Sequence, residues 1–205
     1  MRCVLAVTAA TVLCLPVAAA DEGEVVFKDC FDGELAEGWS WIREDPEDWR
    51  IVDGALEIRA RPGHAQTVRN ALVRDVPWDA GRRLAFEVTV TFTAPPTEQY
   101  EQAGLTWYHD GDPVFKVVHE LVDGRIVIVP GFAATEKDTV RLRLVVDEGR
   151  YQAQFRQEGE EEYHTVQEGD LPVGENDQIS IQTYHGPADA DHWMQFRDFR
   201  ILRLP

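Results

Sequence analysis

Cysteine is scarce in this sequence, and its scarcity excludes a fold held by internal disulfides. The chain has three cysteines, and two of them, Cys3 and Cys14, lie in the first twenty residues. We expect that segment to be removed, which leaves only Cys30 and no partner for it. We interpret Cys30 as a small buried hydrophobe; a reactive thiol is the alternative.

Long apolar runs are also missing, apart from one at the start of the chain. Arg2 is followed by the apolar run Cys3–Val17, and then by the small residues Ala18–Ala20 of a cleavage site. The run is too short to span a bilayer with ease. We therefore predict a signal peptide over residues 1–20, a secreted or periplasmic protein, and no membrane insertion.

Positive charge is in short supply. Lysine and arginine number 20 against 37 aspartates and glutamates, which gives a formal net charge of -17. So acidic a chain repels nucleic acid and anionic membrane surfaces, and we expect neither as a partner. The charge suits a neutral or cationic partner, or calcium, but it would equally serve only to keep a secreted protein soluble.

The sequence contains no long helical period with capping residues, and none of the common catalytic signatures. It lacks GxSxG, HExxH, a Gly-rich phosphate loop and a cysteine-based metal motif. The six histidines have no compact ligand spacing, so we interpret them as packed structural residues. These absences leave the question of enzymatic activity open, and we favour a protein without it.

What the sequence does have is short runs of alternating apolar and polar residues, separated by turn signals such as Asp53-Gly54 and Asp123-Gly124. This pattern predicts an all-β fold, a two-sheet antiparallel jelly-roll sandwich, as one domain over residues 21–205. We expect the first and last strands to pair, which would hide both edges. The predicted strands are Glu24–Asp29, Trp49–Val52, Ala55–Ala60, Ala71–Val76, Leu84–Thr93, Ala103–His109, Val114–Glu120, Arg125–Pro130, Thr139–Asp147, Arg150–Arg156, Gln178–Tyr184 and Trp193–Leu204.

The segment Glu101–Glu120 reads as two strands joined by the turn Asp110–Pro113. A period of two turns one side of each strand to the core and the other to solvent or a ligand. If the longer strands share one sheet, its outer side collects long polar side chains and aromatic rings, the groups that bind sugar hydroxyls and stack on sugar rings. The alternative is a solvated sheet with cross-strand charge pairs. The outward residues are Glu87, Tyr108, Lys116, Glu120, Arg143, Gln154, Gln182 and Tyr184.

Tryptophan is concentrated at Trp39, Trp41 and Trp49. One or two of these rings should anchor the core. Arg43 and Glu44 precede a proline-containing loop, so we predict that they contact the ligand at a rim, together with Trp41.

Three aspartates on the terminal strands form a candidate calcium site. Asp29 and Asp32 flank the first strand, and Asp198 lies in the last. Carboxylate oxygens on adjacent strands are ligands that calcium accepts, although the spacing is not that of an EF-hand.

Several short motifs occur in an order found in a known family. They are Phe27–Asp32, Gly38–Trp41, Trp49–Leu56, Asn70–Val73, Glu101–Tyr108 and the lone Glu120. On these motifs the chain resembles the concanavalin A-like, laminin G-like domain at the C-terminus of family 43 β-xylosidases, and related stand-alone bacterial domains of unknown function. The resemblance implies a jelly roll in a sugar-linked setting. It does not imply catalysis, because in the β-xylosidases this domain accompanies a separate catalytic propeller, which is absent here.

These readings favour a secreted carbohydrate-binding or carbohydrate-associated module that is not catalytic, with a glycan or sugar as its partner. One alternative is a glycan-acting hydrolase that uses Glu101, Glu120 or Glu44 as its acid or base. The other is a structural interaction domain of the cell envelope, because a fold alone does not give a function.

Overall fold

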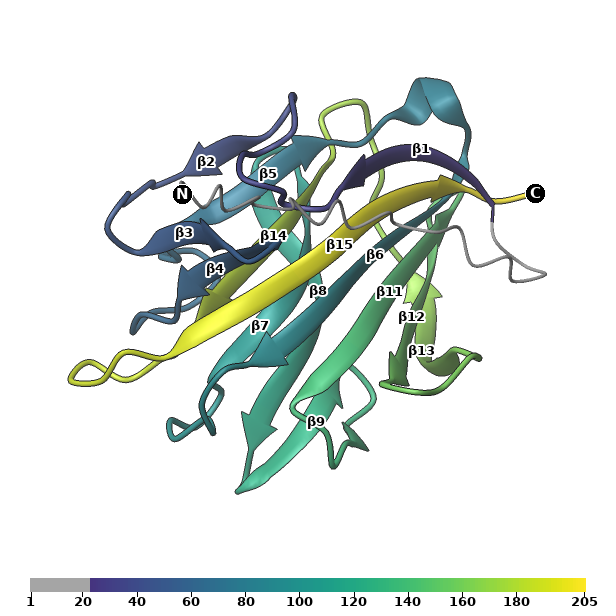
Figure 1. The fold of residues 1–205 in the computed structure, drawn as a ribbon. Coiled ribbons are helices and arrows are strands. Elements are labelled where there is room, and N and C mark those ends of the chain that lie inside the picture. Colours follow the sequence, from purple (N-terminus) through teal and green to yellow (C-terminus); the bar gives the residue numbers. More distant parts are fainter. Residues whose placement is uncertain (1–22) are drawn as a thin grey trace, which may run out of the picture.

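Two antiparallel sheets packed face to face form the structure, a computed structural model that describes residues 23–205 (Figure 1). The predicted signal peptide, with Cys3 and Cys14, lies outside these residues. Sheet A runs in the order β13 (His164–Asp170), β12 (Arg150–Gln157), β11 (Thr139–Asp147), β6 (Arg83–Phe92), β15 (Trp193–Arg203), β4 (Ala55–Arg59) and β3 (Trp49–Val52), with β1 (Glu24–Asp29) also paired to β15. Sheet B runs in the order β10 (Ala133–Ala134), β9 (Arg125–Val129), β8 (Asp112–Val122), β7 (Gln102–His109), β14 (Gln178–Tyr184), β5 (Ala71–Asp75) and β2 (Ser40–Ile42).

Tight turns join many of the neighbouring strands, as the sequence predicted. The turn between β7 and β8 is Asp110-Gly111, with φ of 48° and 85°. The turn between β8 and β9 is Asp123-Gly124, with φ of 49° and 74°. Positive φ at both central residues matches the right-handed twist of a hairpin, and aspartate and glycine tolerate that conformation best.

The core fills the space between the two sheets. Trp107 from β7 is fully buried and meets the ring of Phe86 from β6 edge to face, with ring centroids 5.6 Å apart. Such aromatic pairs add to the stabilisation from removing apolar area from water. The inward residues of β7, β8 and β14 thus belong to the core. The residues that alternate with them along each strand lie on the outward side of the sheet.

The two terminal strands pair side by side, which confirms that expectation. Glu24 of β1 lies opposite Arg203 of β15, and Asp29 lies opposite Phe199. We expected Cys30, just after β1, to be buried in the core, but it is only partly buried. Phe31 takes the buried position instead, with φ of 55°.

Apart from strands, residues 23–205 form one short 3-10 helix, Trp78–Ala80. No helix in this part of the chain is long and apolar enough to cross a membrane.

Candidate functional site

The outward side of β8, β7 and β14 carries a compact set of polar side chains, which we call the polar face. The strand register places these side chains in rows. One row is Tyr184, Gln102 and Glu120; the next is Gln182, Gly104 and Val118; the third is Ser180, Thr106 and Lys116. Because opposite residues of antiparallel strands share one side of a sheet, the side chains in these rows lie on the outward side together, and Gly104 contributes none. The sequence-based assignment of side is therefore correct for Tyr108, Lys116, Glu120, Gln182 and Tyr184.

Direct contacts tie the polar side chains to one another. The Lys116 ammonium donates to Gln102 Oε1 at 2.6 Å and to Glu120 Oε2 at 2.8 Å. Gln102 is itself fixed, because its Nε2 donates to the Tyr100 carbonyl oxygen at 2.7 Å. Bonds of this kind hold side chains in one geometry before a ligand arrives, which lowers the entropy lost on binding.

A second group of contacts surrounds Gln182. Its Oε1 accepts hydrogen bonds from the Tyr108 hydroxyl at 2.9 Å and from the Ser180 hydroxyl at 3.1 Å. Its Nε2 is buried and has no hydrogen-bond partner among residues 23–205, and the same is true of Thr106 Oγ1. Buried polar groups are nearly always paired, so this amide is an exception among the described residues.

Gly104 lies between these two groups and has no side chain. Its neighbours across the sheet are Gln182 on β14 and Val118 on β8. A Cβ at this position would lie 2.4 Å from the Val117 carbonyl oxygen and 2.8 Å from a methyl carbon of Leu142. Only glycine fits here, because a side chain at this position would run into β8 and into the interior of the sandwich.

A loop over residues 61–70 covers one end of the polar face. Val68 and Ala65 from this loop pack with the rings of Tyr108 and Tyr184, which are 1% and 4% exposed. Burial raises the pKa of both tyrosines. Neither ring is free to stack on a sugar, so Tyr108 contributes only its hydroxyl.

The aromatic group that does reach solvent is one that the sequence analysis did not single out. Tyr100 precedes β7 and is 47% exposed; its ring lies edge-on to the His185 imidazole, with centroids 6.0 Å apart. Burial lowers the pKa of His185, and the charges of Lys116 and His64 lower it further. Tyr100 lies in a turn, with φ of 71°. The alternating pattern of the strands therefore gives no sign of it, and only a turn signal in the sequence could have pointed to it.

Glu120 is the carboxylate at the centre of this arrangement. It is 4% exposed, and burial raises its pKa although the Lys116 charge and hydrogen bond lower it. A carboxyl group with a raised pKa can exchange a proton closer to neutral pH than an ordinary glutamate.

Arg43 lies beside the polar face, where its charge lowers the pKa of Tyr108 in opposition to the larger effect of burial. Its Nε donates to the Val68 carbonyl oxygen at 2.6 Å, so the guanidinium borders the loop over residues 61–70. Arg43 is exposed in the structure, and its predicted contact with a ligand stays a prediction.

Three residues expected on the same face lie on the other sheet. Glu87, Arg143 and Gln154 belong to β6, β11 and β12 of sheet A. Glu87 is buried there and pairs with Arg141 at 2.9 Å and with Arg143 at 3.3 Å. The prediction of one shared face is wrong for these residues, because alternation fixes the side of a strand but not the sheet that the strand joins.

The other predicted ligand contacts have structural partners. Glu101 is fully buried; its carboxylate accepts from the backbone N–H of Thr97 at 2.8 Å and lies 2.7 Å from His192 Nδ1. Glu44 accepts a hydrogen bond from Trp49 Nε1 at 3.1 Å. Trp41 packs against the ring of Trp49 at 4.9 Å and borders the core.

The three aspartates proposed for calcium are not brought together. The Asp29 carboxylate accepts from the N–H groups of Phe31 and Ala36 and from Trp39 Nε1, at 2.7 to 2.9 Å. Asp198 pairs with Arg141 at 3.0 Å, and Asp32 is exposed. Within residues 23–205 no group of three histidine, cysteine, aspartate or glutamate side chains is placed to hold a metal ion.

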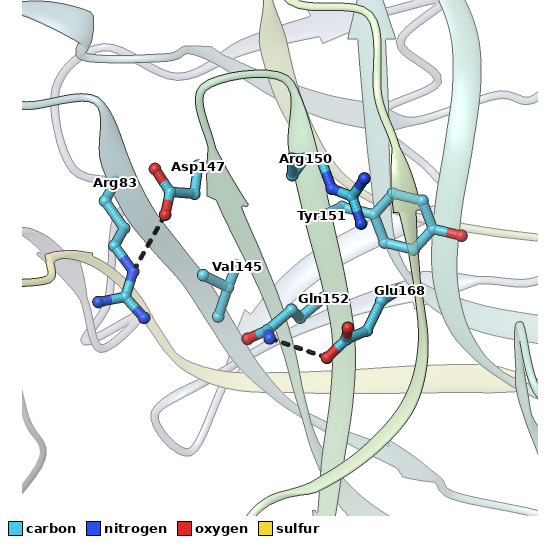
Figure 2. Close-up of a pocket in the computed structure, with 7 residues that line it drawn as sticks. All are labelled: Arg83, Val145, Asp147, Arg150, Tyr151, Gln152 and Glu168. Atoms are coloured by element: carbon cyan, nitrogen blue, oxygen red, sulfur yellow. Dashed lines mark hydrogen bonds and ion pairs between the residues drawn. The ribbon is translucent and has the colours of Figure 1, made fainter.

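A surface hollow lies on sheet A, away from the polar face (Figure 2). Its charged groups already have partners: Arg83 pairs with Asp147 at 3.5 Å, and Gln152 donates to Glu168 at 2.9 Å. Arg150 pairs with Asp170 at 3.2 Å. Because these groups satisfy one another, the hollow offers a ligand few free hydrogen-bonding groups.

Comparison with known proteins shows the fold. No family model and no curated protein matches the sequence. Among solved structures, the family 43 protein BlXynB of Bacillus licheniformis, as its K247S mutant, has a TM-score of 0.71 and 18% identity, covering 92% of this chain and 41% of that chain. The xylan β-1,4-xylosidase of Bacillus halodurans C-125 has a TM-score of 0.65 and 17% identity, covering 93% and 41%.

A third solved structure comes from work on endo-acting O-glycanases of the human gut microbiota that initiate mucin breakdown. It has a TM-score of 0.58 and 12% identity, covering 89% of this chain and 100% of that chain. The present chain thus spans only about two fifths of the length of each of the two Bacillus proteins, whereas the match covers the full length of the third structure. These likenesses show that the chain adopts the concanavalin A-like jelly roll, a fold found in carbohydrate-active proteins.

Proposed function

We propose that the protein is a secreted or periplasmic carbohydrate-binding module, without chemistry of its own, that takes a sugar on the polar face. The observation that carries this proposal is the network of Lys116, Gln102 and Glu120 beside the partly unpaired Gln182. Long planar polar side chains in fixed positions are what bidentate hydrogen bonding to sugar hydroxyls requires.

The exposed ring of Tyr100 supports the same reading. Sugar rings have apolar C–H faces, and an aromatic ring beside polar groups covers such a face while the polar groups bind the hydroxyls. Tyr100 and His185 lie next to Gln102 and Lys116, and this closeness of an exposed ring to polar groups supports the proposal. The structural neighbours named above are, at the coarse level, glycan-related proteins.

The glutamates favour binding over hydrolysis. Glycoside hydrolysis usually needs two carboxyl groups on opposite sides of the scissile bond. Of the three glutamates considered, only Glu120 lies on the polar face, since Glu101 is fully buried and Glu44 bonds to Trp49.

One observation keeps an enzymatic function as the second candidate. Glu120 has a raised pKa next to a lysine, the environment of many general acids. If turnover of a glycan is found, Glu120→Gln should abolish it while the protein keeps its fold, as judged by circular dichroism.

The proposal is tested by screening the protein on a glycan array and measuring the best ligand by calorimetry. We expect Tyr100→Ala to weaken binding about tenfold, since loss of an aromatic anchor is a typical hot-spot effect. Gln154→Ala is the matched control, because Gln154 was predicted on the same face but lies on sheet A. The proposal fails if no glycan binds, or if the two variants weaken binding equally.

A further inference from the structure

We propose that a second hollow, at one end of the sandwich, binds a neutral sugar ring. We call it the end hollow. It is lined by Val76, Trp78, Asp79 and Arg82, and by residues 173–175 of the loop before β14. The end hollow shares no lining residue with the polar face, so the inference adds a separate site and has only the class of ligand in common with the proposed function.

The end hollow has room for a ligand. It lies where the chain crosses from sheet B to sheet A, since β5 ends at Asp75 and β6 begins at Arg83. The loop before β14 lies beside this crossing, because Asp75 is opposite Gln178 in the sheet. The volume of the hollow is about 510 Å³. Pockets of about 300 to 1,000 Å³ hold small molecules, so a sugar ring fits here.

Trp78 supplies an aromatic ring whose position is fixed. The side chain is only partly buried, and its Nε1 donates to the Gly174 carbonyl oxygen at 2.8 Å. Its ring meets that of Trp107 edge to face, with centroids 6.0 Å apart. Because the indole is held in place before a ligand arrives, little entropy is lost on binding. A partly exposed aromatic ring is the group that covers the apolar C–H side of a sugar.

The loop before β14 is anchored as well. The buried carboxylate of Asp177 accepts from the Gly174 N–H at 2.7 Å, and its other oxygen lies 2.7 Å from His109 Nδ1. Trp107 Nε1 donates to the Pro172 carbonyl oxygen at 3.1 Å. These bonds fix the loop on both sides of residue 173. The end hollow is therefore bounded by two segments that already have a defined geometry.

Three charged side chains of the end hollow have no partner in the part of the chain that the structure describes. Asp79, Arg82 and Glu175 are exposed and form no hydrogen bond or ion pair within residues 23–205. The Arg82 guanidinium lies 5.7 Å from the centroid of the Trp78 ring. The charged groups of the hollow on sheet A, by contrast, pair with one another.

This mixture of free groups favours a neutral ligand. A carboxylate only accepts hydrogen bonds and a guanidinium only donates them, whereas a hydroxyl does both. A cationic ligand would be repelled by Arg82, and an anionic one by Asp79 and Glu175. A sugar with hydroxyl groups and no charge can use all three side chains while its ring covers Trp78.

The test uses the β-1,4-linked hexamers of glucose, xylose and mannose as neutral probes, with the hexamers of glucosamine and galacturonic acid as charged comparisons. Nuclear magnetic resonance of the whole chain, labelled in nitrogen, follows the indole N–H signal of Trp78. The variant Trp78→Phe identifies that signal by its loss. We expect at least one neutral hexamer to shift the signal, and neither charged hexamer to shift it more.

Calorimetry with that hexamer should show Glu175→Ala binding about fivefold more weakly, as expected when one surface hydrogen bond is lost. The matched control is Glu158→Ala, which removes the same charge from the exposed turn between β12 and β13 and should leave binding unchanged. Trp78→Leu should weaken binding further. If that variant does not fold, Glu175→Ala and the Trp78 signal decide the matter.

The outcomes separate this inference from the proposed function, which Tyr100→Ala tests. If Tyr100→Ala weakens binding while Glu175→Ala and the Trp78 signal show no effect, the end hollow is not a sugar site and the polar face stands. The reverse result supports the end hollow and overturns the polar face. The inference is also wrong if no neutral hexamer shifts the Trp78 signal, or if Glu158→Ala weakens binding as much as Glu175→Ala does.

Discussion

At the scale of single residues, burial decides which property of a side chain remains available. Tyr108 is buried under Val68 and keeps only its hydroxyl for Gln182, whereas Tyr100 exposes its ring. The sequence favoured Tyr108 as a stacking group, because alternation shows the direction of a side chain and not what covers it. A loop distant in sequence provides that cover.

His119 gives a prediction at this scale. It is fully buried, its ring stacks on Phe92 with centroids 4.5 Å apart, and burial lowers its pKa to about 3. The unfolded chain takes up a proton at this imidazole near its ordinary pKa of 6.5, but the folded protein does so only near the lowered value. Stability is therefore lost as the pH falls from about 6.5 towards 3, by at most about 1.4 kcal/mol per pH unit.

The measurement is urea unfolding at several pH values for the protein and for His119→Gln. Glutamine stays neutral and can still bond to Thr135, whose Oγ1 lies 3.0 Å from His119 Nε2. The variant should lose stability less steeply on acidification. The carboxylates are the same in both proteins, so their contribution to the pH dependence cancels in the comparison. If the free energy of unfolding falls equally steeply with pH in both proteins, His119 does not carry the effect.

At the scale of elements, the loop over residues 61–70 depends on one buried carboxylate. Asp48 is fully buried and accepts two hydrogen bonds from the Arg61 guanidinium, both at 2.6 Å. Arg59 lies 3.6 Å from the same carboxylate. This contact fixes the start of the loop that covers Tyr108 and Tyr184.

We expect Arg61→Met to loosen that loop. Removing one partner of a buried charge leaves the other unpaired and is destabilising, by up to about 3 kcal/mol here because Arg59 still faces Asp48. Hydrogen exchange should rise over residues 61–70 more than in β6, and affinity for the sugar should fall. Arg150→Met, which breaks an exposed pair with Asp170, is the control and should change neither quantity.

The strands show how far the sequence could predict the structure. Runs with strict alternation, such as β6 and β11, were predicted almost to their ends, and so was the outward side of Lys116 and Glu120. The strand β13 was not predicted, because its residues are mostly exposed and do not alternate. The division of the strands between two sheets was also missed, since it depends on pairing between distant segments. That is why Glu87 and Arg143 were placed on the wrong sheet.

At the scale of the whole molecule, the two ends of the described chain meet on sheet A. Glu24 lies opposite Arg203, and the side chains of these two residues form an ion pair. The polar face lies on sheet B, which belongs to the other layer of the sandwich (Figure 1).

This arrangement predicts that the chain can be circularly permuted. A short flexible linker from Pro205 to Gly23, with new ends opened at the turn Glu148-Gly149, should give a protein that folds and binds sugar as the original does. Circular dichroism, thermal unfolding and calorimetry provide the measurements. A permutant opened inside β6 serves as the contrast and should not fold; failure of the first permutant would contradict the expected closeness of the ends.

The glycine at the centre of the polar face has a consequence for how this surface could change. A methyl group at position 104 would collide with the Val117 carbonyl oxygen and with Leu142, which belongs to the opposite sheet and to the interior. The interior packing therefore forbids larger residues here whether or not a sugar ever binds. Mutation can retune the groups around this spot, but the spot itself stays vacant for as long as the two layers remain in contact.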